Sequence, residues 1–263
     1  MLYYCRSAQV LGGKMKRADI KLFLTDNGNK AKAYALAQET GAQIVTDEMP
    51  HEGLFLKFDA DGVSLCDGGL CVRGDFAESC ARIKRENLRN ELLVKAVKIK
   101  NADRPLTVVD ATAGLGEDSF LLAAYGHSLT LFEYDPFIYA LLEDALERAR
   151  LSREVGLTAS RITAVGCDSV MALRELNFAP DVVLLDPMFP QRQKSSLVKK
   201  KFQLLHSLES PCANEEELLD AARAAGPKKI VIKRPAKGAF LAGIKPDYSL
   251  EGKKIRYDCI CLK

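Results

Sequence analysis

The chain of 263 residues has no tryptophan and only three histidines, and none of its eight cysteines forms a C-x-x-C pair. Zinc is usually held by closely spaced cysteines and histidines, so we expect no metal site. The first ten residues also lack the basic-then-apolar order of a secretory signal. We therefore expect the cysteines to be free and mostly buried thiols.

Long apolar runs and a strong excess of one charge are absent as well. No run approaches the roughly 18 apolar residues that suggest a membrane span, so we expect a cytoplasmic protein without a membrane partner. The formal net charge is only +3, which does not by itself indicate a polyanionic partner. The clustering of the basic residues therefore matters more than their number.

Residues 1–80 predict a small N-terminal α/β domain. Its expected strands cover residues 20–24, 43–45, 54–58 and 62–65. Between the last two, the sequence Asp-Ala-Asp-Gly is typical of a hairpin turn, and it lacks the further oxygen ligands of a calcium loop. Residues 76–100 place apolar side chains at three- and four-residue spacing, which predicts one helix that joins this domain to the next.

Residues 81–263 predict a doubly wound, Rossmann-like α/β sheet. Strands are expected at residues 106–109, 129–132, 161–165, 182–185 and 229–232, with helices at 118–125, 137–150 and 215–225. Runs this apolar are typical of strands covered by helices on both faces, so the sheet should be mostly parallel. Residues 248–250 and 255–262 predict an antiparallel C-terminal hairpin.

A loop of small residues follows the first strand of this sheet and leads directly into a helix. Its sequence is Asp110-Ala-Thr-Ala-Gly114-Leu-Gly116-Glu117-Asp118. In an open α/β sheet, such a loop lets a nucleotide-like ligand approach the backbone amides at the helix start. Glu133 ends the next strand about 20 residues onward, where a carboxylate can accept hydrogen bonds from both hydroxyls of a ribose.

The charges around this loop favour S-adenosylmethionine over a nicotinamide dinucleotide. The dinucleotide fingerprint G-x-G-x-x-G/A has Ser119 at its third position here, behind Glu117 and Asp118, whose carboxylates would repel a pyrophosphate. S-adenosylmethionine has no phosphate and carries a cationic sulfonium. A further acid, Asp168, follows the third strand and is placed to reach the adenine amine. The alternative for each acid is a helix cap or a surface charge.

An Asp-Pro-x-aromatic motif, residues 186–189, follows the apolar residues 182–185. Methyl transfer to an exocyclic amine requires a planar NH2 group held in line with the methyl–sulfur bond. Asp186 and a proline-fixed carbonyl can accept its two hydrogens, while the ring of Phe189 stacks on the base. We therefore expect Asp186 and Phe189 to be the catalytic residues, with a rigid turn as the alternative.

These motifs resemble those of the bacterial small-subunit ribosomal RNA guanine-N2 methyltransferases, within the class I S-adenosylmethionine-dependent amino-methyltransferases. The resemblance rests on residues 110–116, 186–190, 194–200 and 231–235. It implies methyl transfer to the 2-amino group of a guanine, with ribosomal RNA or the small ribosomal subunit as partner. The implied cofactor contacts are Glu117, Asp118, Glu133, Tyr134, Asp168, Ser169 and Asp186, beside Asp110, Gly114 and Gly116 of the loop.

Other functions stay open on the residues alone. The same motif is used for amino-methylation of adenine in DNA or RNA, and a glycine-rich loop also occurs in NAD(P)-dependent oxidoreductases. A non-catalytic binding module is a further alternative.

Basic residues gather directly after the motif, because residues 191–201 hold five basic side chains and no acid. Three more, Lys233, Arg234 and Lys237, follow the fifth strand at the same edge of the sheet. We expect both groups to contact phosphates that flank a flipped-out base, with a solvated basic loop as the alternative. The expected RNA contacts are Arg192, Lys194, Lys199, Lys200, Lys233 and Arg234.

Overall fold

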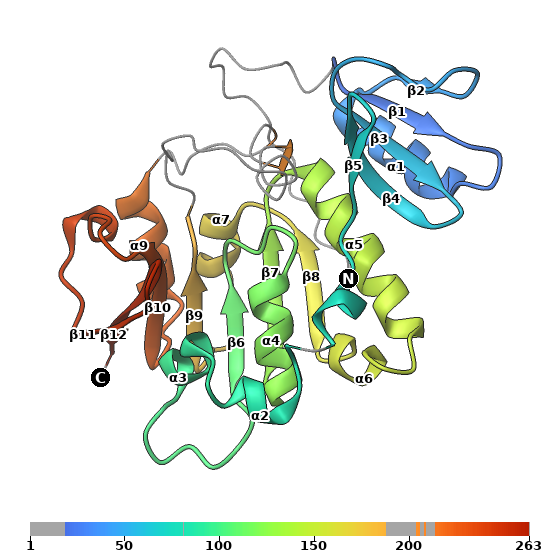
Figure 1. Ribbon diagram of the computed structural model, residues 1–263. Coiled ribbons are helices and arrows are strands. Elements are labelled where there is room, and N and C mark those ends of the chain that lie inside the picture. The colour runs from blue at the N-terminus through green and yellow to red at the C-terminus, as the bar shows by residue number, and fades with distance from the viewer. Residues whose placement is uncertain (1–18, 81, 188–203, 206–207, 209–213, 263) are drawn as a thin grey trace.

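The computed structural model describes residues 19–80, 82–187, 204–205, 208 and 214–262. These residues form two sheets (Figure 1). The smaller sheet has five strands in the order β2-β1-β3-β4-β5, and the larger has seven in the order β11-β12-β10-β9-β6-β7-β8. The predicted α/β class with a mostly parallel large sheet is confirmed.

The smaller sheet is built from the four predicted strands and one more. Its strands are β1 (Lys21–Leu24), β2 (Ile44–Val45), β3 (Phe55–Asp59), β4 (Gly62–Asp67) and β5 (Leu70–Val72). The predicted hairpin is confirmed, since β3 and β4 pair antiparallel up to Asp59 and Gly62. Helix α1 (Lys30–Thr40) begins after Asn29, whose side chain accepts a hydrogen bond from the Lys32 amide, and ends at Gly41 in the left-handed conformation.

The single helix predicted over residues 76–100 is wrong. The chain there forms three short pieces: η2 (Phe76–Ser79), α2 (Arg85–Leu88) and α3 (Leu92–Val97). Glu91 has an extended backbone with ψ of 128°, and this conformation interrupts the helix before α3. The Glu91 carboxylate pairs with Arg82 at 2.7 Å. The spaced apolar residues are buried, but they do not form one continuous helix. Phe76, for example, stacks its ring on that of Phe120 at 4.4 Å.

The larger sheet has helices on both faces, and its parallel strands are β6 (Thr107–Asp110), β7 (Ser128–Glu133), β8 (Ile162–Gly166), β9 (Val182–Leu185) and β10 (Lys229–Pro235). The predicted hairpin is confirmed as β11 (Tyr248–Glu251) and β12 (Ile255–Cys261), which pair antiparallel. The helices are α4 (Glu117–Tyr125), α5 (Pro136–Leu151), α6 (Gly156–Ala159), α7 (Ser169–Arg174) and α9 (Glu215–Ala224), with the short η3 (Leu241–Gly243).

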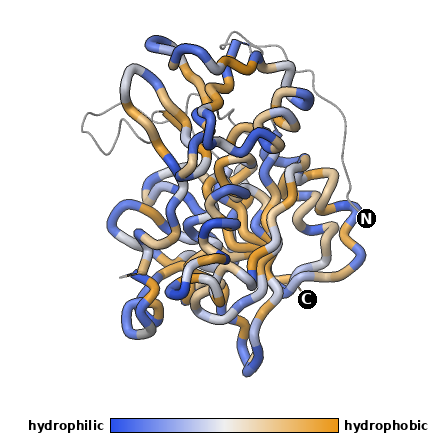
Figure 2. Tube along the Cα trace, turned by 90° about the vertical axis from the view of Figure 1, so that its right-hand side faces the viewer, coloured by the Kyte–Doolittle hydropathy of each residue, from blue (hydrophilic) through white to orange (hydrophobic). Residues whose placement is uncertain are grey.

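Successive strand residues alternate between two hydrophobic cores, as expected for a covered sheet. Val108 and Val182 pack with α3 and α4 on one face, and Val109 and Val183 pack with α7 and α9 on the other. Figure 2 shows hydrophobic residues running through the middle of the molecule and hydrophilic ones in the outer turns. The two packed layers fix the loops at the strand ends, where the polar residues of interest lie.

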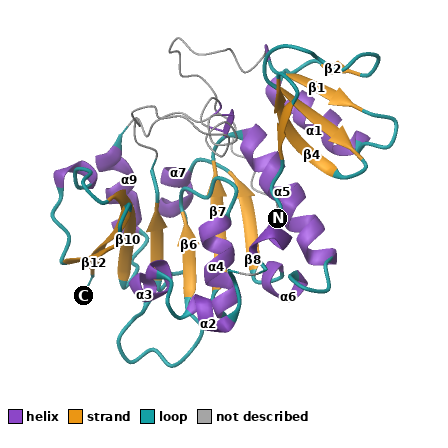
Figure 3. Ribbon diagram, in the orientation of Figure 1, coloured by secondary structure: helices purple, strands orange, loops and turns teal. Residues whose placement is uncertain are grey.

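The smaller sheet packs against helix α5 (Figure 3). Leu56 and Phe58 share a core with Phe137 and Leu141 of α5. Gly62 leaves no room for a larger residue here, because a Cβ on it would clash with the side chains of Asp144 and Arg148 in α5. Since α5 begins at the carboxyl end of β7, this contact holds the smaller sheet beside the carboxyl edge of the larger one.

Two of the cysteines differ from expectation. Cys66 and Cys71 form a disulfide between the paired strands β4 and β5, so the expectation of free thiols is wrong for this pair. Outside this disulfide, the thiols of Cys80 and Cys167 are half-buried, that of Cys259 is buried and that of Cys261 is exposed. In the described parts of the chain, no helix combines the length and the apolar character needed to cross a membrane.

Candidate active site at the carboxyl edge of the large sheet

The strand order brings the predicted site residues to one edge. After β6 the chain adds β7 and β8 on one side and then returns to add β9 on the other, so the loops after β6 and β9 meet where the order reverses. Open α/β sheets bind ligands at such a switch point. Asp110 and Glu133 are the last residues of β6 and β7, and Asp186 directly follows β9 at this edge.

The glycine loop leaves open space on one side. Gly114 has φ of 55°, and a Cβ built on it would meet nothing within 4 Å. Gly116 also has a positive φ, but a Cβ there would lie 2.9 Å from Leu142, so this glycine is needed for packing at the start of α4. The loop is held by Glu133, whose Oε2 accepts a hydrogen bond from the Gly114 amide at 2.8 Å.

Asp110 lies beneath this loop and is buried. It accepts hydrogen bonds from the Ser119 hydroxyl at 2.6 Å and from the Thr112 amide at 3.1 Å. Burial raises the pKa of Asp110 to about 6, against the lowering effect of these bonds. These contacts give Asp110 a part in shaping the loop.

Asp186 is fixed to the glycine loop through its backbone and to β10 through its side chain. Its amide donates to Oγ1 of Thr112 at 2.6 Å. Its Oδ2 pairs with Nζ of Lys233 at 2.8 Å, and the same Nζ lies 2.7 Å from Oδ2 of Asp118. Burial raises the pKa of Asp186, although Lys233 opposes this shift. Two carboxylates and one ammonium thus meet beside the loop.

The other predicted cofactor residues surround this centre. Asp168 caps α7, because its Oδ1 accepts from the amides of Val170 and Met171 at 2.8 and 3.2 Å; the helix-cap interpretation thus holds for this oxygen. Ser169 is the first residue of α7. Glu117 is exposed in the first turn of α4, and Tyr134 is 47% exposed after β7.

Two of the predicted RNA contacts lie inside the sheet. Strand β10 continues to Pro235, three residues beyond the predicted end at 232, so Lys233 and Arg234 are strand residues. Lys233 is engaged with Asp118 and Asp186, and Arg234 is 3% exposed and pairs with Glu215 at 3.3 Å. Both side chains therefore pair with acids of the protein itself. Phe189, Arg192, Lys194, Lys199 and Lys200 lie outside the described residues.

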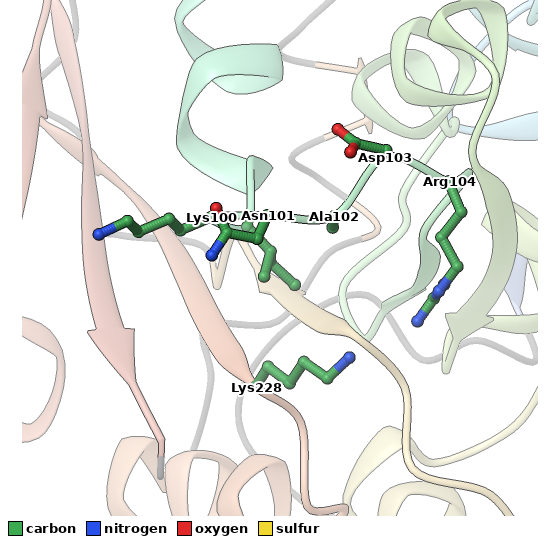
Figure 4. Close-up of a pocket in the computed structure, with 7 residues that line it drawn as sticks. Lys100, Asn101, Ala102, Asp103, Arg104 and Lys228 are labelled. Carbon is green, nitrogen blue, oxygen red and sulfur yellow. The ribbon is translucent and has the colours of Figure 1, made fainter.

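A cavity of about 510 Å³ lies at the opposite, amino end of the sheet (Figure 4). Arg104 and Lys228 line it, and both extend to Asp181, at 2.7 and 2.9 Å. Asp181 also accepts the Thr107 amide at 3.0 Å. Burial opposes ionisation, but the Arg104 and Lys228 bonds hold the pKa of Asp181 well below its usual value. Arg104 and Lys228 are thus both paired with Asp181, which indicates a structural role for these three residues.

Comparison with known proteins identifies the family. The model of a SAM-dependent methyltransferase family matches residues 42–261, which is most of the chain. The chain belongs to this family. This methyltransferase is 45% identical over 190 residues to Ribosomal RNA small subunit methyltransferase J from Pseudomonas aeruginosa, covering 71% of this chain and 72% of that protein.

Two further relatives are similar over nearly their whole length. The protein of the same name from Neisseria meningitidis is 40% identical over 240 residues, covering 89% of this methyltransferase and 94% of the relative. The crystal structure of a SAM-dependent methyltransferase from Neisseria gonorrhoeae is 34% identical, with a TM-score of 0.73, and the match covers 92% of this chain and 95% of that one. The Rossmann-like methyltransferase fold is thereby confirmed.

S-adenosylmethionine is the cofactor of this family, and the carboxyl edge fits it. The space over Gly114 would be filled by a Cβ, so the loop leaves room for a ligand against its backbone. The carboxylates of Glu133, Asp118 and Asp186 give this edge negative charge, which suits a ligand that carries a cationic sulfonium. In the described residues, no group of three or more histidine, cysteine or acidic side chains is arranged to hold a metal.

Proposed function

We propose that this methyltransferase transfers the methyl group of S-adenosylmethionine to the exocyclic 2-amino group of a guanine in small-subunit ribosomal RNA. The observation that carries the proposal is the position of Asp186. It lies at the switch point beside the glycine loop, in a chain 40% identical over most of its length to proteins named Ribosomal RNA small subunit methyltransferase J. The guanine amine follows from the resemblance of the motif at residues 186–190.

The cofactor is held by the loop and the acidic residues around it. When bound, S-adenosylmethionine supplies a methyl group activated by its cationic sulfonium. Glu133 binds the ribose hydroxyls, because each carboxylate oxygen has two lone pairs and can accept a hydrogen bond from the cofactor beside the one from the Gly114 or Asp135 amide. Asp118 and Asp186 complement the positive charge of the cofactor, and Gly114 leaves room for it.

Asp186 orients the target amine. The lone pair of an exocyclic amine is delocalised into its ring, so the nitrogen becomes a better nucleophile as it turns tetrahedral. A carboxylate that accepts one N–H hydrogen bond favours that geometry, and the bond from the Asp186 amide to Thr112 fixes the residue that provides it. Phe189 contributes stacking on the base, and Arg192, Lys194, Lys199 and Lys200 bind RNA phosphates; these roles rest on the sequence.

The test is methyl transfer by the purified protein, with labelled S-adenosylmethionine. Small-subunit ribosomal RNA, assembled small subunits and duplex DNA are offered in parallel, and calorimetry compares S-adenosylhomocysteine with NADP. We expect label in guanine of the ribosomal RNA and binding of S-adenosylhomocysteine alone. The acid-to-amide change Asp220→Asn, at an exposed residue of α9, is a control that should leave both unchanged. Label in DNA adenine, or binding of NADP alone, would contradict the proposal.

A further inference from the structure

Lys233 has an unusual position for a lysine of an α/β sheet. It lies within β10, and its ammonium points to the carboxyl edge, where it bridges Asp118 and Asp186 at 2.7 and 2.8 Å. The three side chains come from three separate elements: α4, the loop after β9, and β10. One cation thus ties the first turn of α4 to the motif that we propose to hold the target amine.

The charges around Asp186 explain why a cation is needed there. Asp110 and Asp118 lie close to Asp186, and each disfavours its negative charge. The Lys233 ammonium is the closest opposing charge, and the Asp118 and Asp186 carboxylates raise its pKa although burial opposes this, so Lys233 stays charged. The titratable and charged groups that act on Asp186 are Asp110 on β6, Asp118 on α4, Lys233 and Arg234 on β10, and Tyr257 on β12.

We propose that Lys233 is a positioning residue, which keeps the Asp186 carboxylate ionised and aims it from the end of β9 through the shared ion pair with Asp118. This inference rests on the proposed function of Asp186 as acceptor of the target amine. Lys233 acts through Asp186 and does not contact the RNA backbone. A protonated Asp186 would present a donor toward the amine, and an unanchored one would sample several orientations, and both would slow transfer.

Kinetics across pH separate this role from a phosphate contact. Lys233→Met removes the cation, Lys233→Arg keeps it, and Lys245→Met is a matched control at an exposed loop lysine. With saturating cofactor we expect Lys233→Met to lower kcat by about 100-fold near neutral pH. The acidic limb of its kcat profile should also move to higher pH, because Asp186 then protonates more readily. Lys233→Arg should keep the limb in place. A Lys233→Met effect confined to KM for RNA would overturn the proposal.

A second measurement does not depend on activity. The carboxyl carbon of Asp186 is followed by NMR through a pH titration, with the signal assigned by its loss in Asp186→Asn. We expect its titration midpoint to rise in Lys233→Met and to stay near the wild-type value in Lys233→Arg. An unchanged midpoint in a folded Lys233→Met protein would overturn the proposal, even if RNA is methylated. A raised midpoint in a protein that methylates no RNA would support the effect of Lys233 on Asp186 but would contradict the proposed function.

Discussion

Two aspartates flank the buried strand β9, and they lie in opposite surroundings. Asp181 precedes the strand at the amino end of the sheet, and Asp186 follows it at the carboxyl end. The side chain of Asp181 is 4% exposed and meets two cations and one backbone amide, whereas that of Asp186 is 39% exposed and shares one lysine with a second acid.

The two aspartates differ in how well their surroundings stabilise the negative charge. The pKa of Asp181 is lowered, so its charge stabilises the folded state, while the pKa of Asp186 is raised, so its charge is held at a cost. A carboxyl group with a raised pKa is typical of functional sites, because a charge with few protein partners remains able to bind a ligand. One strand thus carries a structural aspartate at one end and a functional one at the other.

The largest expected effect tests the functional end. Asp186→Ala should lower kcat for methyl transfer by about 100- to 1000-fold, because it removes the acceptor for the target amine. Its free energy of unfolding should stay within about 0.5 kcal/mol of wild type, since Lys233 keeps its bond to Asp118. Single-turnover kinetics and urea unfolding measure the two quantities. A stable Asp186→Ala protein with unchanged kcat would contradict the functional role of Asp186.

The structural end should respond the other way. Asp181→Ala is expected to lower the free energy of unfolding by about 2 kcal/mol, because it leaves the Thr107 amide and two cations without their acceptor. The loss of stability is no larger because Arg104 and Lys228 are more than half exposed, so water screens their charges. The value of kcat at a temperature where the protein is folded should not change. A loss of kcat without a loss of stability would contradict the assignment.

Acid stability sharpens the same contrast. An acid whose folded pKa lies below its unfolded value stabilises the protein above the unfolded pKa of about 3.9, and this contribution is lost as pH falls through the folded pKa. Asp181 is such a group. Wild type should therefore lose stability from about pH 4 downward, and Asp181→Asn should flatten that slope. Urea unfolding midpoints between acid and neutral pH measure it, and parallel curves for the two proteins would be the contrary result.

The smallest expected effect concerns one of the two cations at Asp181. Lys228→Met should lower the free energy of unfolding by about 0.5 kcal/mol, because its exposed ammonium is screened by water and Arg104 still binds both oxygens of the carboxylate. Thermal unfolding in low and high salt checks this. A loss as large as that of Asp181→Ala would show that Lys228 alone carries the stabilisation.

Much of the fold could be predicted from the sequence. The buried strands are continuous apolar runs, and their alternation with amphipathic helices dictates a covered parallel sheet. The structure of residues 76–100 could not be predicted, because their apolar residues follow helical spacing but lie in three short helices, with Glu91 extended before the third. The Cys66–Cys71 disulfide also escaped prediction, because it depends on the pairing of β4 with a strand, β5, that the sequence did not predict.

The sequence predicted that the candidate site residues share one edge of the sheet, but it did not predict their partners. Small residues and strand-end acids located the edge, since parallel strands align their carboxyl ends. The partners of these residues depend on tertiary distances that spacing does not encode: Asp110 bonds Ser119 beneath the loop, and Lys233 reaches two acids from β10. A lysine and an arginine directly after an apolar run suggest a surface. The extension of β10 to Pro235 places them inside the sheet instead.

The most direct test of the central claim is mass mapping of small-subunit ribosomal RNA from cells with and without this gene. In cells without it, we predict that one guanine of the small-subunit RNA lacks a methyl group on its 2-amino nitrogen. A plasmid copy of the wild-type gene should restore that methyl group, and the Asp186→Ala variant should not. Identical methylation in the presence and absence of the gene, or full restoration by Asp186→Ala, would contradict the account.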